Sequence, residues 1–362
     1  MIVGIIGGGQ LARMLALAGQ PLGIECLFLD PAVDACARSA GELVCGAYDD
    51  ESLLGVLAAR ADVVTYEFEN VPATSLRYLA ERVRVHPSAE ALGIARDRWH
   101  EKRLFAELGI PTPSFMAVDS WADCEQAVAA IGLPAVLKTR TMGYDGRGQR
   151  MLRSAADLKE GYAALAGMPL ILEGFVPFDR EVSIVAVRSA AGVTRFYPLT
   201  ENLHKGGVLV QSVSRPADPL SAQARAFVSV LLDRLNYVGV LALELFQRGD
   251  RLLANEMAPR VHNSGHWTIE GAETSQFENH LRAVAGLPLG ATGALAAAGM
   301  VNFVGQIPDP QAVLAVPGAH LHVYGKVPRP GRKLGHATVR AADETALYAA
   351  LARLRALAGT AS

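Results

Sequence analysis

The sequence predicts an α/β fold with an α+β centre, divided into more than one domain. Strand-like and helix-like segments alternate through the first 97 residues, which is the pattern of a parallel sheet covered by helices on both faces. Later, two apolar strands are separated by a short turn, which indicates antiparallel pairing. The 362 residues suffice for about two or three domains. A content of 51% hydrophobic and 19% charged residues argues against a disordered chain.

Charge balance and cysteine usage exclude several function classes. Lys plus Arg is 34 and Asp plus Glu is 36, so the net charge of −2 argues against a general nucleic-acid binder. The four cysteines form no CxxC pair, and neither a zinc site nor a disulfide framework is expected. No apolar run reaches the roughly 18 residues of a membrane helix, and residues 1–4 contain no basic leader. We therefore expect a cytoplasmic protein without membrane or nucleic-acid partners.

The first domain is expected at 1–97. A glycine turn joins its first strand to its first helix, and such a turn can bring backbone N–H groups close to a ligand phosphate. Ala12 occupies the last glycine position of the dinucleotide-binding pattern, so a ligand contact is favoured over a bound dinucleotide, with a bare tight turn as the alternative. Asp30 ends the second strand, where NAD-binding folds often hold their ribose acid. The strand, turn, helix and two further strands are expected at 2–6, 7–9, 10–18, 26–30 and 61–66.

A smaller α+β unit is expected at 98–190. Asp97 is a good N-cap for its first helix. Lys138 ends a strand and is followed by a polar, glycine-rich loop at 141–149. An amine beside backbone N–H groups suits a polyphosphate, whereas the loop alone would equally well be a surface segment. The strands of this unit are expected at 135–139, 170–173 and 181–187.

The remaining unit, 191–362, contains a hairpin that carries two acidic residues. Its strands at 238–246 and 251–257 place Glu244 opposite Glu256. Two carboxylates that face each other in an apolar setting repel unless a cation lies between them, and oxygen ligands favour Mg²⁺ over zinc. The alternative is one acid paired with an arginine in the core and the other at the surface. A helix, a surface connection, a strand and a helical tail are expected at 275–286, 291–299, 299–305 and from 343 onwards.

Two polar clusters are further candidates for a binding site. The first cluster follows the hairpin directly and consists of Arg260, His262, Asn263, Ser264, Gly265 and His266. So many polar residues in succession are rarely part of a hydrophobic core, and a surface loop is the alternative. The second is the densest basic run of the chain and indicates a site for one phosphate group, because arginine forks bind phosphate bidentately. It consists of Lys326, Arg329, Arg332 and Lys333, with a solvated basic loop as the alternative.

Taken together, these motifs resemble the ATP-grasp superfamily and, within it, the family of N5-carboxyaminoimidazole ribonucleotide synthases. The resemblance runs from residue 2 to about residue 340. Its most specific stretches are GGGQLARM at 7–14, YEFENVP at 66–72, GYDGRGQ at 143–149, YPLTENLH at 197–204, NEMAPRVHNSGHWT at 255–268 and RPGRKLGH at 329–336. It implies a three-domain ATP-grasp architecture: a Rossmann-like pre-ATP-grasp domain without NAD at 1–97, a small central ATP-grasp domain at 98–190, and a C-terminal ATP-grasp domain with the metal site and a basic phosphate clamp at 191–362.

The resemblance also implies an activity. This family joins 5-aminoimidazole ribonucleotide to bicarbonate through carboxyphosphate, using ATP and Mg²⁺, in purine biosynthesis, and its members are commonly homodimers. A formate-dependent transformylase acting on glycinamide ribonucleotide is the nearest rival, but the HNSGH and GYDGRGQ stretches favour the carboxylating family. A biotin carboxylase, an NAD-dependent oxidoreductase and a non-catalytic nucleotide-binding regulator are more distant alternatives.

Individual roles follow from the same resemblance. ATP would be held by Arg98, Lys138, Gly143, Tyr144, Asp145, Gly146, Arg147, Gly148, Gln149, Glu173, Gly174, Phe175, Val176, Glu181, His204, Asn255 and Glu256. Mg²⁺ would be bound by Glu244 and Glu256, and Ala258 stands where superfamily members often have Asn, which leaves the third ligand open. The ribonucleotide would contact Gln10, Leu11, Glu69, Tyr144, Asp145, Arg147, Lys326, Arg332 and Lys333, with Glu67 competing with Glu69. Arg260, His262 and Asn263 would bind carboxyphosphate, and Asp145 would be the general base.

Overall fold

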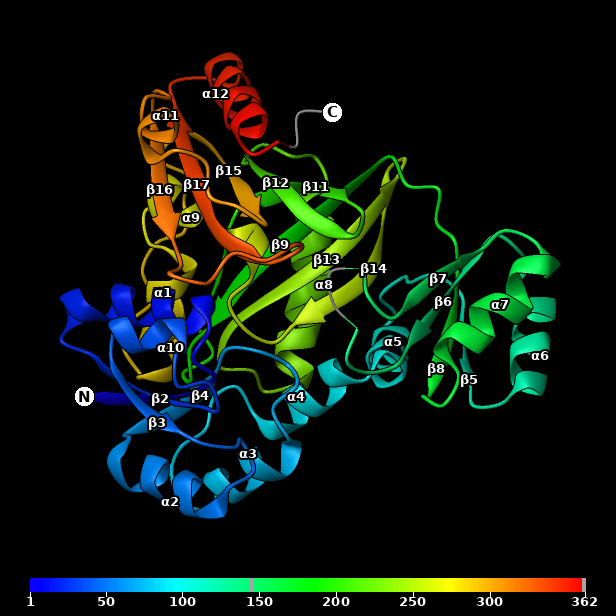
Figure 1. The fold of residues 1–362 in the computed structure, drawn as a ribbon, viewed down its shortest axis with the longest axis horizontal. Helices are drawn as coiled ribbons and strands as arrows, with labels where there is room; N and C mark the ends of the chain where they lie inside the picture. Colours follow the sequence, from blue (N-terminus) through cyan, green and yellow to red (C-terminus); the bar gives the residue numbers. More distant parts are fainter. Residues whose placement is uncertain (144–145, 360–362) are drawn as a thin grey trace.

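The computed structural model describes residues 1–143 and 146–359. Strands within these ranges form three sheets. Figure 1 shows a smaller lobe, built from β5–β8 with α6 and α7, standing to one side of a larger body. No helix in the described ranges is long and apolar enough to cross a membrane. Tyr144 and Asp145, both predicted site residues, lie outside the described residues.

The first sheet is parallel, with the strand order β3-β2-β1-β4. Val3 and Ile5 of β1 pack into one apolar cluster, whereas Ile6 packs into another. Because successive side chains of a strand point to opposite faces, this division confirms a sheet that is covered on both sides. The elements are β1 (Ile2–Ile6), α1 (Gln10–Gly19), η1 (Gln20–Leu22), β2 (Glu25–Asp30), η2 (Cys36–Ser39), β3 (Glu42–Cys45), α2 (Glu51–Arg60), β4 (Val63–Tyr66), α3 (Ala73–Ala80) and α4 (Ala89–Arg96). The sequence does not predict β3, since this strand is only four residues long and half exposed.

The second sheet is antiparallel, with the order β5-β8-β6-β7. Its core includes Leu137 and Leu172 of the sheet and Cys124 of α6. The helix that leads into this unit, α5, begins after Asp97, whose carboxylate accepts a 2.9 Å hydrogen bond from the Trp99 backbone N–H, as the N-cap prediction requires. The elements are α5 (Arg98–Glu107), β5 (Phe115–Val118), α6 (Trp121–Ile131), β6 (Ala135–Thr139), β7 (Gln149–Leu152), α7 (Ala155–Leu165) and β8 (Leu170–Gly174).

The third sheet has nine antiparallel strands. Eight of them follow the order β14-β13-β9-β11-β12-β15-β17-β16, and β10 pairs with β9. The strands are β9 (Arg180–Arg188), β10 (Thr194–Phe196), β11 (Leu199–Lys205), β12 (Val208–Arg215), β13 (Gly239–Arg248), β14 (Arg251–Ala258), β15 (Ala297–Val304), β16 (Ala319–Val323) and β17 (Lys333–Ala341). The helices are α8 (Ser221–Arg234), η3 (Asn263–Gly265), α9 (Thr268–Gly271), α10 (Gln276–Val284), α11 (Pro310–Leu314) and α12 (Glu344–Leu357).

The first and third sheets share a hydrophobic core. Met14 and Leu15 of α1 belong to the same apolar cluster as Phe277 and Leu281 of α10. The other face of the large sheet packs on α8 in a separate cluster. Figure 1 accordingly shows α1 lying along α10 between the two sheets, and this packing fixes the glycine turn of the first unit relative to the third.

Two sequence expectations differ from the structure in detail. β9, expected in the central unit, pairs with β11 and β13 and so belongs to the large sheet. This pairing favours a division before β9 rather than at residue 190, although the domain limits themselves stay a prediction. The surface connection predicted at 291–299 is shorter than expected, because β15 begins at Ala297 and buries Ala298 completely.

Candidate active site

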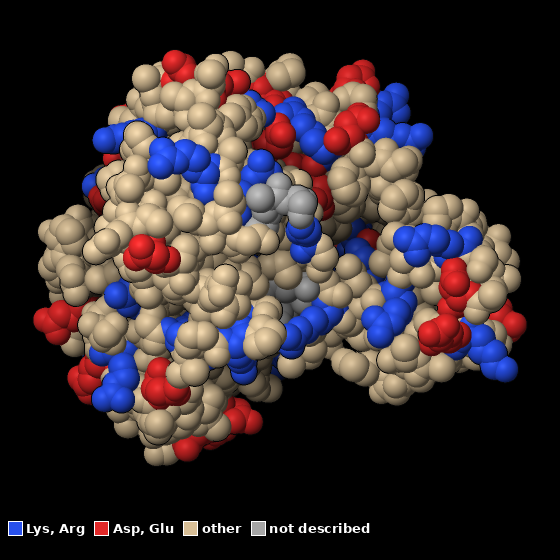
Figure 2. Space-filling view, turned by 45° about the horizontal axis from the view of Figure 1, so that its top comes forward, with Lys and Arg blue, Asp and Glu red and all other residues tan. Residues whose placement is uncertain are grey.

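A single cleft collects residues from all three sheets. Its volume is about 740 Å³. Figure 2 shows Lys and Arg side chains gathered around a hollow between the smaller lobe and the body. The predicted site residues that line the cleft are Gln10, Leu11, Glu67, Glu69, Arg98, Lys138, Gly143, Gly146, Arg147, Gln149, Glu173, Gly174, Phe175, Val176, Glu181, His204, Glu244, Asn255, Glu256, Arg260, His262, Asn263, Lys326, Arg332 and Lys333. Gly148 packs instead against Thr139, whose side-chain oxygen would lie 2.6 Å from a Cβ at that position.

The glycine turn of the first sheet binds the protein's own carboxylates. Gly8 N donates to Asp30 Oδ2 over 2.8 Å, Gly9 N donates to Glu67 Oε1, and Ala12 N donates to Glu67 Oε2 over 2.9 Å. These N–H groups at the start of α1 therefore already have acceptors and are not open to a dinucleotide phosphate. Asp30 also accepts a hydrogen bond from the Tyr48 hydroxyl, so the NAD-type interpretation of this turn has no support.

Glu67 and Glu69 have different partners in the structure. Both Glu67 oxygens accept backbone N–H groups, and burial raises the pKa of this carboxyl against the opposing effect of those bonds. Glu69 instead forms an ion pair with Arg260. Glu69 is therefore paired with Arg260, which is itself a candidate ligand-binding residue, whereas Glu67 is bound to backbone N–H groups.

The two acids of the hairpin meet as the sequence predicts, and a β-bulge adds a third polar residue. Glu244 pairs with Glu256, but Leu245 pairs with Ala254, so Asn255 is the extra residue of β14. A bulge re-aims side chains, and Ala254 packs into the core while Asn255 and Glu256 line the cleft. The Asn255 Oδ1 atom is buried and has no hydrogen-bond partner among the described residues.

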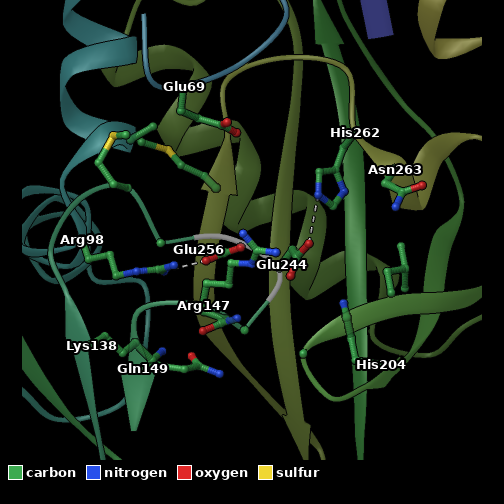
Figure 3. A pocket seen from close by; sticks show the side chains of 18 of the residues that line it. Glu69, Arg98, Lys138, Arg147, Gln149, His204, Glu244, Glu256, His262 and Asn263 are labelled. Atoms are coloured by element: carbon green, nitrogen blue, oxygen red, sulfur yellow. Dashed lines mark hydrogen bonds and ion pairs between the residues drawn. The ribbon is translucent and has the colours of Figure 1, made fainter. Parts of the chain in front are cut away.

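The carboxyls of this hairpin differ strongly in charge environment. Arg98 Nη1 lies 2.6 Å from Glu256 Oε2. Burial raises the pKa of Glu256, but Arg98 and Lys138 outweigh burial and lower it to about 2. Burial and the charge of Glu256 raise the pKa of Glu244 to about 7. Figure 3 shows both acids beside Arg98 and His262, and His262 Nε2 lies 3.1 Å from Glu244 Oε1.

This donor set fits a hard cation. Within the described ranges no three or more His, Cys, Asp or Glu side chains converge on a common point. What the hairpin offers is two carboxylates and the unpartnered amide oxygen of Asn255. Oxygen ligands that leave room for water suit Mg²⁺.

A buried ion-pair group supports the candidate phosphate-binding lysine. Lys138 Nζ lies 2.9 Å from Glu173 Oε2, and Lys102 Nζ lies 3.5 Å from the same atom. Lys102 also donates to the backbone oxygen of Asn255 over 2.6 Å, and burial lowers its pKa. Lys102 was not predicted as a site residue, although its position four residues after Arg98 puts both side chains on one face of α5. The Glu173 side chain therefore anchors the basic residues beside the hairpin.

The opposite wall of the cleft carries paired and aromatic side chains. His204 Nδ1 lies 2.7 Å from Glu181 Oε2, and the hydrogen bond raises the pKa of His204 although burial lowers it. Phe178 and Phe246 stack with ring centroids 4.9 Å apart and planes 7° from parallel. Both rings line the cleft and had no sequence signal beyond being apolar.

The polar run after the hairpin lines the cleft and is not a surface loop. Ser264 is completely buried and His266 is 1% exposed. Both side-chain polar atoms of Asn263 are buried without a hydrogen-bond partner among the described residues. Buried amides normally have partners, so the Asn263 donor and acceptor make this residue a candidate for contact with a ligand.

The basic cluster stands at the end of the cleft that the first sheet forms. Lys326 hydrogen-bonds to Gln10 Oε1, which brings the third sheet's loop to the start of α1. Burial lowers the pKa of Lys326, and Arg332 and Arg329 lower it further. Crowded cations of this kind favour a bound anion.

The fold and this cleft define an ATP-grasp enzyme. An ATP-grasp domain matches residues 103–277, a ribonucleotide synthetase preATP-grasp domain matches residues 1–96, and a phosphoribosylaminoimidazole carboxylase C-terminal domain matches residues 298–350. The chain is therefore an ATP-grasp ligase with a preATP-grasp domain at its N-terminal end.

Similar proteins narrow the class to one family. An N5-carboxyaminoimidazole ribonucleotide synthase of Pseudomonas aeruginosa is 58% identical over 99% of this chain and 99% of its own length. The crystal structure of an N5-carboxyaminoimidazole ribonucleotide synthetase from Thermus thermophilus is 55% identical, with a TM-score of 0.94 over 98% of each chain. A structure from Aspergillus clavatus, in complex with ADP and 5-aminoimidazole ribonucleotide, is 29% identical with a TM-score of 0.90, and covers 99% of this chain and 98% of its own. The chain belongs to the N5-carboxyaminoimidazole ribonucleotide synthase family.

Proposed function

We propose that the cleft carries out the ATP- and bicarbonate-dependent N-carboxylation of 5-aminoimidazole ribonucleotide in purine biosynthesis. The observation that carries this proposal is that one cleft holds both the acidic hairpin with Lys138 and the basic cluster with Lys326. A polyphosphate with a metal ion fits the first end, and a single phosphate group fits the second. The Aspergillus clavatus relative that contains both ADP and 5-aminoimidazole ribonucleotide supports the same pairing of ligands.

We assign ATP to the end of the cleft that contains the acidic hairpin, because the side chains there suit its phosphates and ribose. Arg98 and Lys138 bind its phosphates, Glu181 binds the ribose hydroxyls, and His204 completes the ATP site. Backbone groups of residues 173–176 bind adenine, beside the stacked Phe178 and Phe246. These positions are supported by the way each of these groups lines the cleft. The further ATP contacts are assigned to the loop residues Gly143, Gly146, Arg147 and Gln149.

Mg²⁺ is assigned to the hairpin. Glu244 and Glu256 would bind it, and the orphaned Oδ1 of Asn255 makes this amide our candidate for the third ligand. When bound, the ion neutralises charge on phosphate oxygens. The arginine on Glu256 supports this assignment, because an acid held ionised by a neighbouring cation stays available as a ligand.

The chemistry proceeds in two stages. A bicarbonate oxygen bonds to the γ-phosphorus, ADP leaves, and carboxyphosphate forms while Arg98 and Lys138 stabilise the phosphoryl charge. Arg260, His262 and Asn263 hold carboxyphosphate as it separates into CO₂ and phosphate. The unpartnered Asn263 amide supports this role.

In the second stage the exocyclic amine of the ribonucleotide bonds to the carbon of CO₂ and loses its proton to Asp145. Asp145 and Tyr144 lie outside the described residues, and their assignment is supported by their neighbours Gly143 and Gly146, which line the cleft. Lys326 and Arg332, with Lys333, form the 5′-phosphate clamp, and Gln10, Leu11 and Glu69 face the same nucleotide. A homodimer in the cytoplasm remains our prediction, and light scattering of the pure protein tests its first part.

The decisive experiment measures ADP release with ATP, Mg²⁺ and bicarbonate, with and without 5-aminoimidazole ribonucleotide. Strong stimulation and recovery of the labile carboxylated product support the proposal. A parallel assay supplies glycinamide ribonucleotide and formate. Stimulation in that assay alone, by a folded protein that binds ATP, would transfer the assignment to the transformylase reaction.

A further inference from the structure

A row of buried polar side chains leads away from the cleft behind His262. His262 stands beside Glu244, and its other ring nitrogen, Nδ1, faces Ser264. The Ser264 backbone N–H donates to Nδ1 over 3.3 Å, and the Ser264 Oγ lies 2.9 Å from the same atom. A nitrogen that accepts an N–H bond carries no proton. His262 therefore holds its proton on Nε2, the nitrogen that points to Glu244 and the cleft (Figure 3).

Three more residues extend this row through the sheet. Ser212 of β12 donates to Asn202 Oδ1 of β11 over 2.7 Å, and Asn202 Nδ2 donates to Ser183 Oγ of β9 over 2.9 Å. Ser183 then donates to Ser264 Oγ over 2.8 Å. We call Ser212, Asn202, Ser183 and Ser264 the donor chain.

The donor chain has one direction. Ser183 Oγ receives the Asn202 N–H, so its own proton is left for Ser264. Ser264 Oγ receives that proton and has its own left for His262 Nδ1. Each hydroxyl has a single proton, and the Asn202 amide, with its oxygen on Ser212 and its nitrogen on Ser183, sets the order for all of them.

The donor chain lies in the buried interior, where an unpaired polar group destabilises the fold most. Ser183, Ser212 and Ser264 are completely buried, and Asn202 is 7% exposed. Neighbouring positions of β9, Val182 and Ile184, are ordinary core residues. Buried polar groups destabilise a fold unless they are fully paired, and a paired chain fixes the orientation of its members.

We propose that the donor chain positions His262 by directing the Ser264 hydroxyl proton to Nδ1, beside the Ser264 backbone N–H, so that Nε2 presents an N–H to the anion handled in the cleft. Ser183 brings the donor chain to the right place, because its strand position lies directly opposite Glu244 on β13. The acceptor of that N–H during turnover, a carboxyphosphate oxygen, rests on the proposed function. The tautomer itself is a property of the resting protein and does not depend on the reaction.

The test uses ¹⁵N-histidine NMR of the full chain without ligands, with the His262 signals assigned by His262→Asn. We expect an unprotonated Nδ1 and a protonated Nε2. Asn202→Asp replaces the donating amide with a carboxylate of nearly the same shape. Ser183 then donates to this carboxylate and Ser264 turns toward Ser183, so His262 Nδ1 loses the hydroxyl hydrogen bond and keeps only the 3.3 Å bond from the Ser264 backbone N–H. We expect the ¹⁵N signal of Nδ1 to move downfield, toward that of an unprotonated nitrogen without a hydrogen bond.

Kinetics give the second readout. Ser264→Ala and Asn202→Asp should each lower kcat about tenfold or more, as loss of an orienting hydrogen bond does at metal sites, with the KM for ATP within twofold. Ser214→Ala is the matched control, because Ser214 is a buried serine of the same strand as Ser212 whose hydroxyl has no partner among the described residues. It should change neither readout.

Two results would overturn the inference. The first is a protonated Nδ1 in the wild-type protein. The second is an Asn202→Asp variant, folded by circular dichroism, with the Nδ1 signal at its wild-type position. A protein that shows the expected ¹⁵N signals but no carboxylation would retain the donor chain and lose the proposed function, so the two failures are distinguishable.

Discussion

Arg98 and Glu256 form an ion pair of 2.6 Å that joins the first turn of α5 to the bulged strand of the acidic hairpin. The pair holds an acid ionised at a position where burial alone would protonate it. The same contact thus connects the candidate metal site with the candidate phosphate site.

We expect Arg98→Met to raise the KM for ATP by roughly 10- to 100-fold, since charge-assisted hydrogen bonds contribute about 1.5–3 kcal/mol. Steady-state kinetics with varied ATP measure this. Arg103→Met is the control on the same helix, because Arg103 forms a 3.3 Å pair with Glu107 in which both side chains are more than half exposed. Equal KM values for the two variants would remove Arg98 from the ATP site.

Substitutions in the basic cluster should affect the ribonucleotide and leave ATP almost unaffected. Lys326→Ala and Arg332→Ala should each raise the KM for 5-aminoimidazole ribonucleotide at least tenfold, because each removes a cation from its phosphate. The KM for ATP should stay within twofold. Arg340→Ala, on the exposed part of β17, serves as the control. The reverse pattern, with ATP affected and the ribonucleotide not, would place the clamp on ATP.

Asp145→Asn tests the proposed general base. The amide keeps the size and hydrogen-bonding capacity of the side chain but cannot take the proton, so we expect kcat to fall at least 100-fold. The dissociation constant of the ribonucleotide, measured by calorimetry, should change by less than threefold. Turnover equal to that of the wild-type protein would exclude Asp145 from proton transfer.

Gly9 is a position of the glycine turn where a side chain has no room. A Cβ there would lie 2.5 Å from Glu67 Oε1, so Gly9→Ala displaces the carboxylate that caps α1, and overpacking of this kind costs about 1–3 kcal/mol. Gly93 lies within α4 and a Cβ there would have no heavy atom within 4 Å. Gly93→Ala should therefore stabilise the protein by up to about 1 kcal/mol. Urea unfolding measures both, and effects of the same sign would contradict this account of the turn.

Much of the architecture was predictable because its signals are local. The Asp97 cap, the alternation of β9 and the turn at 248–250 each depend on neighbouring residues, and the hairpin places Glu244 opposite Glu256 as expected. The bulge at Asn255 was not predictable, because a shift of one residue depends on how β14 packs.

The contacts that the sequence did not predict join residues that are distant along the chain. Glu67 accepts a hydrogen bond from the Ala12 N–H at the start of α1, 55 residues away, and no local pattern in either segment indicates this contact. β15 extends into the alanine-rich segment because Gly299 lies against β12, where a Cβ would come within 2.8 Å of the Ser212 backbone oxygen. Small residues there permit close strand contact, whereas the composition alone indicated a surface connection.

His280 gives the protein a pH-dependent stability that is separate from the cleft. Its Nδ1 accepts the Val240 N–H over 3.1 Å, and its Nε2 lies 2.9 Å from Thr65 Oγ1. A nitrogen that accepts this bond has no proton, so the folded state holds a neutral ring. Burial and the nearby His86 lower the pKa of His280 to about 3 from an ordinary value of 6.5.

The sign of the effect follows from linkage. Above about pH 6.5 the ring is neutral in both states and contributes nothing to the pH dependence. As the pH falls below this value, the unfolded state takes up a proton that the folded state cannot, so the free energy of unfolding decreases until about pH 3. His280→Gln keeps an acceptor for Val240 and a donor for Thr65 but does not titrate. Between pH 7 and pH 5 the wild-type free energy of unfolding should fall by about 2 kcal/mol more than that of the variant. Urea unfolding at both values measures this, and parallel pH curves would show that His280 takes up its proton equally in the folded and unfolded states.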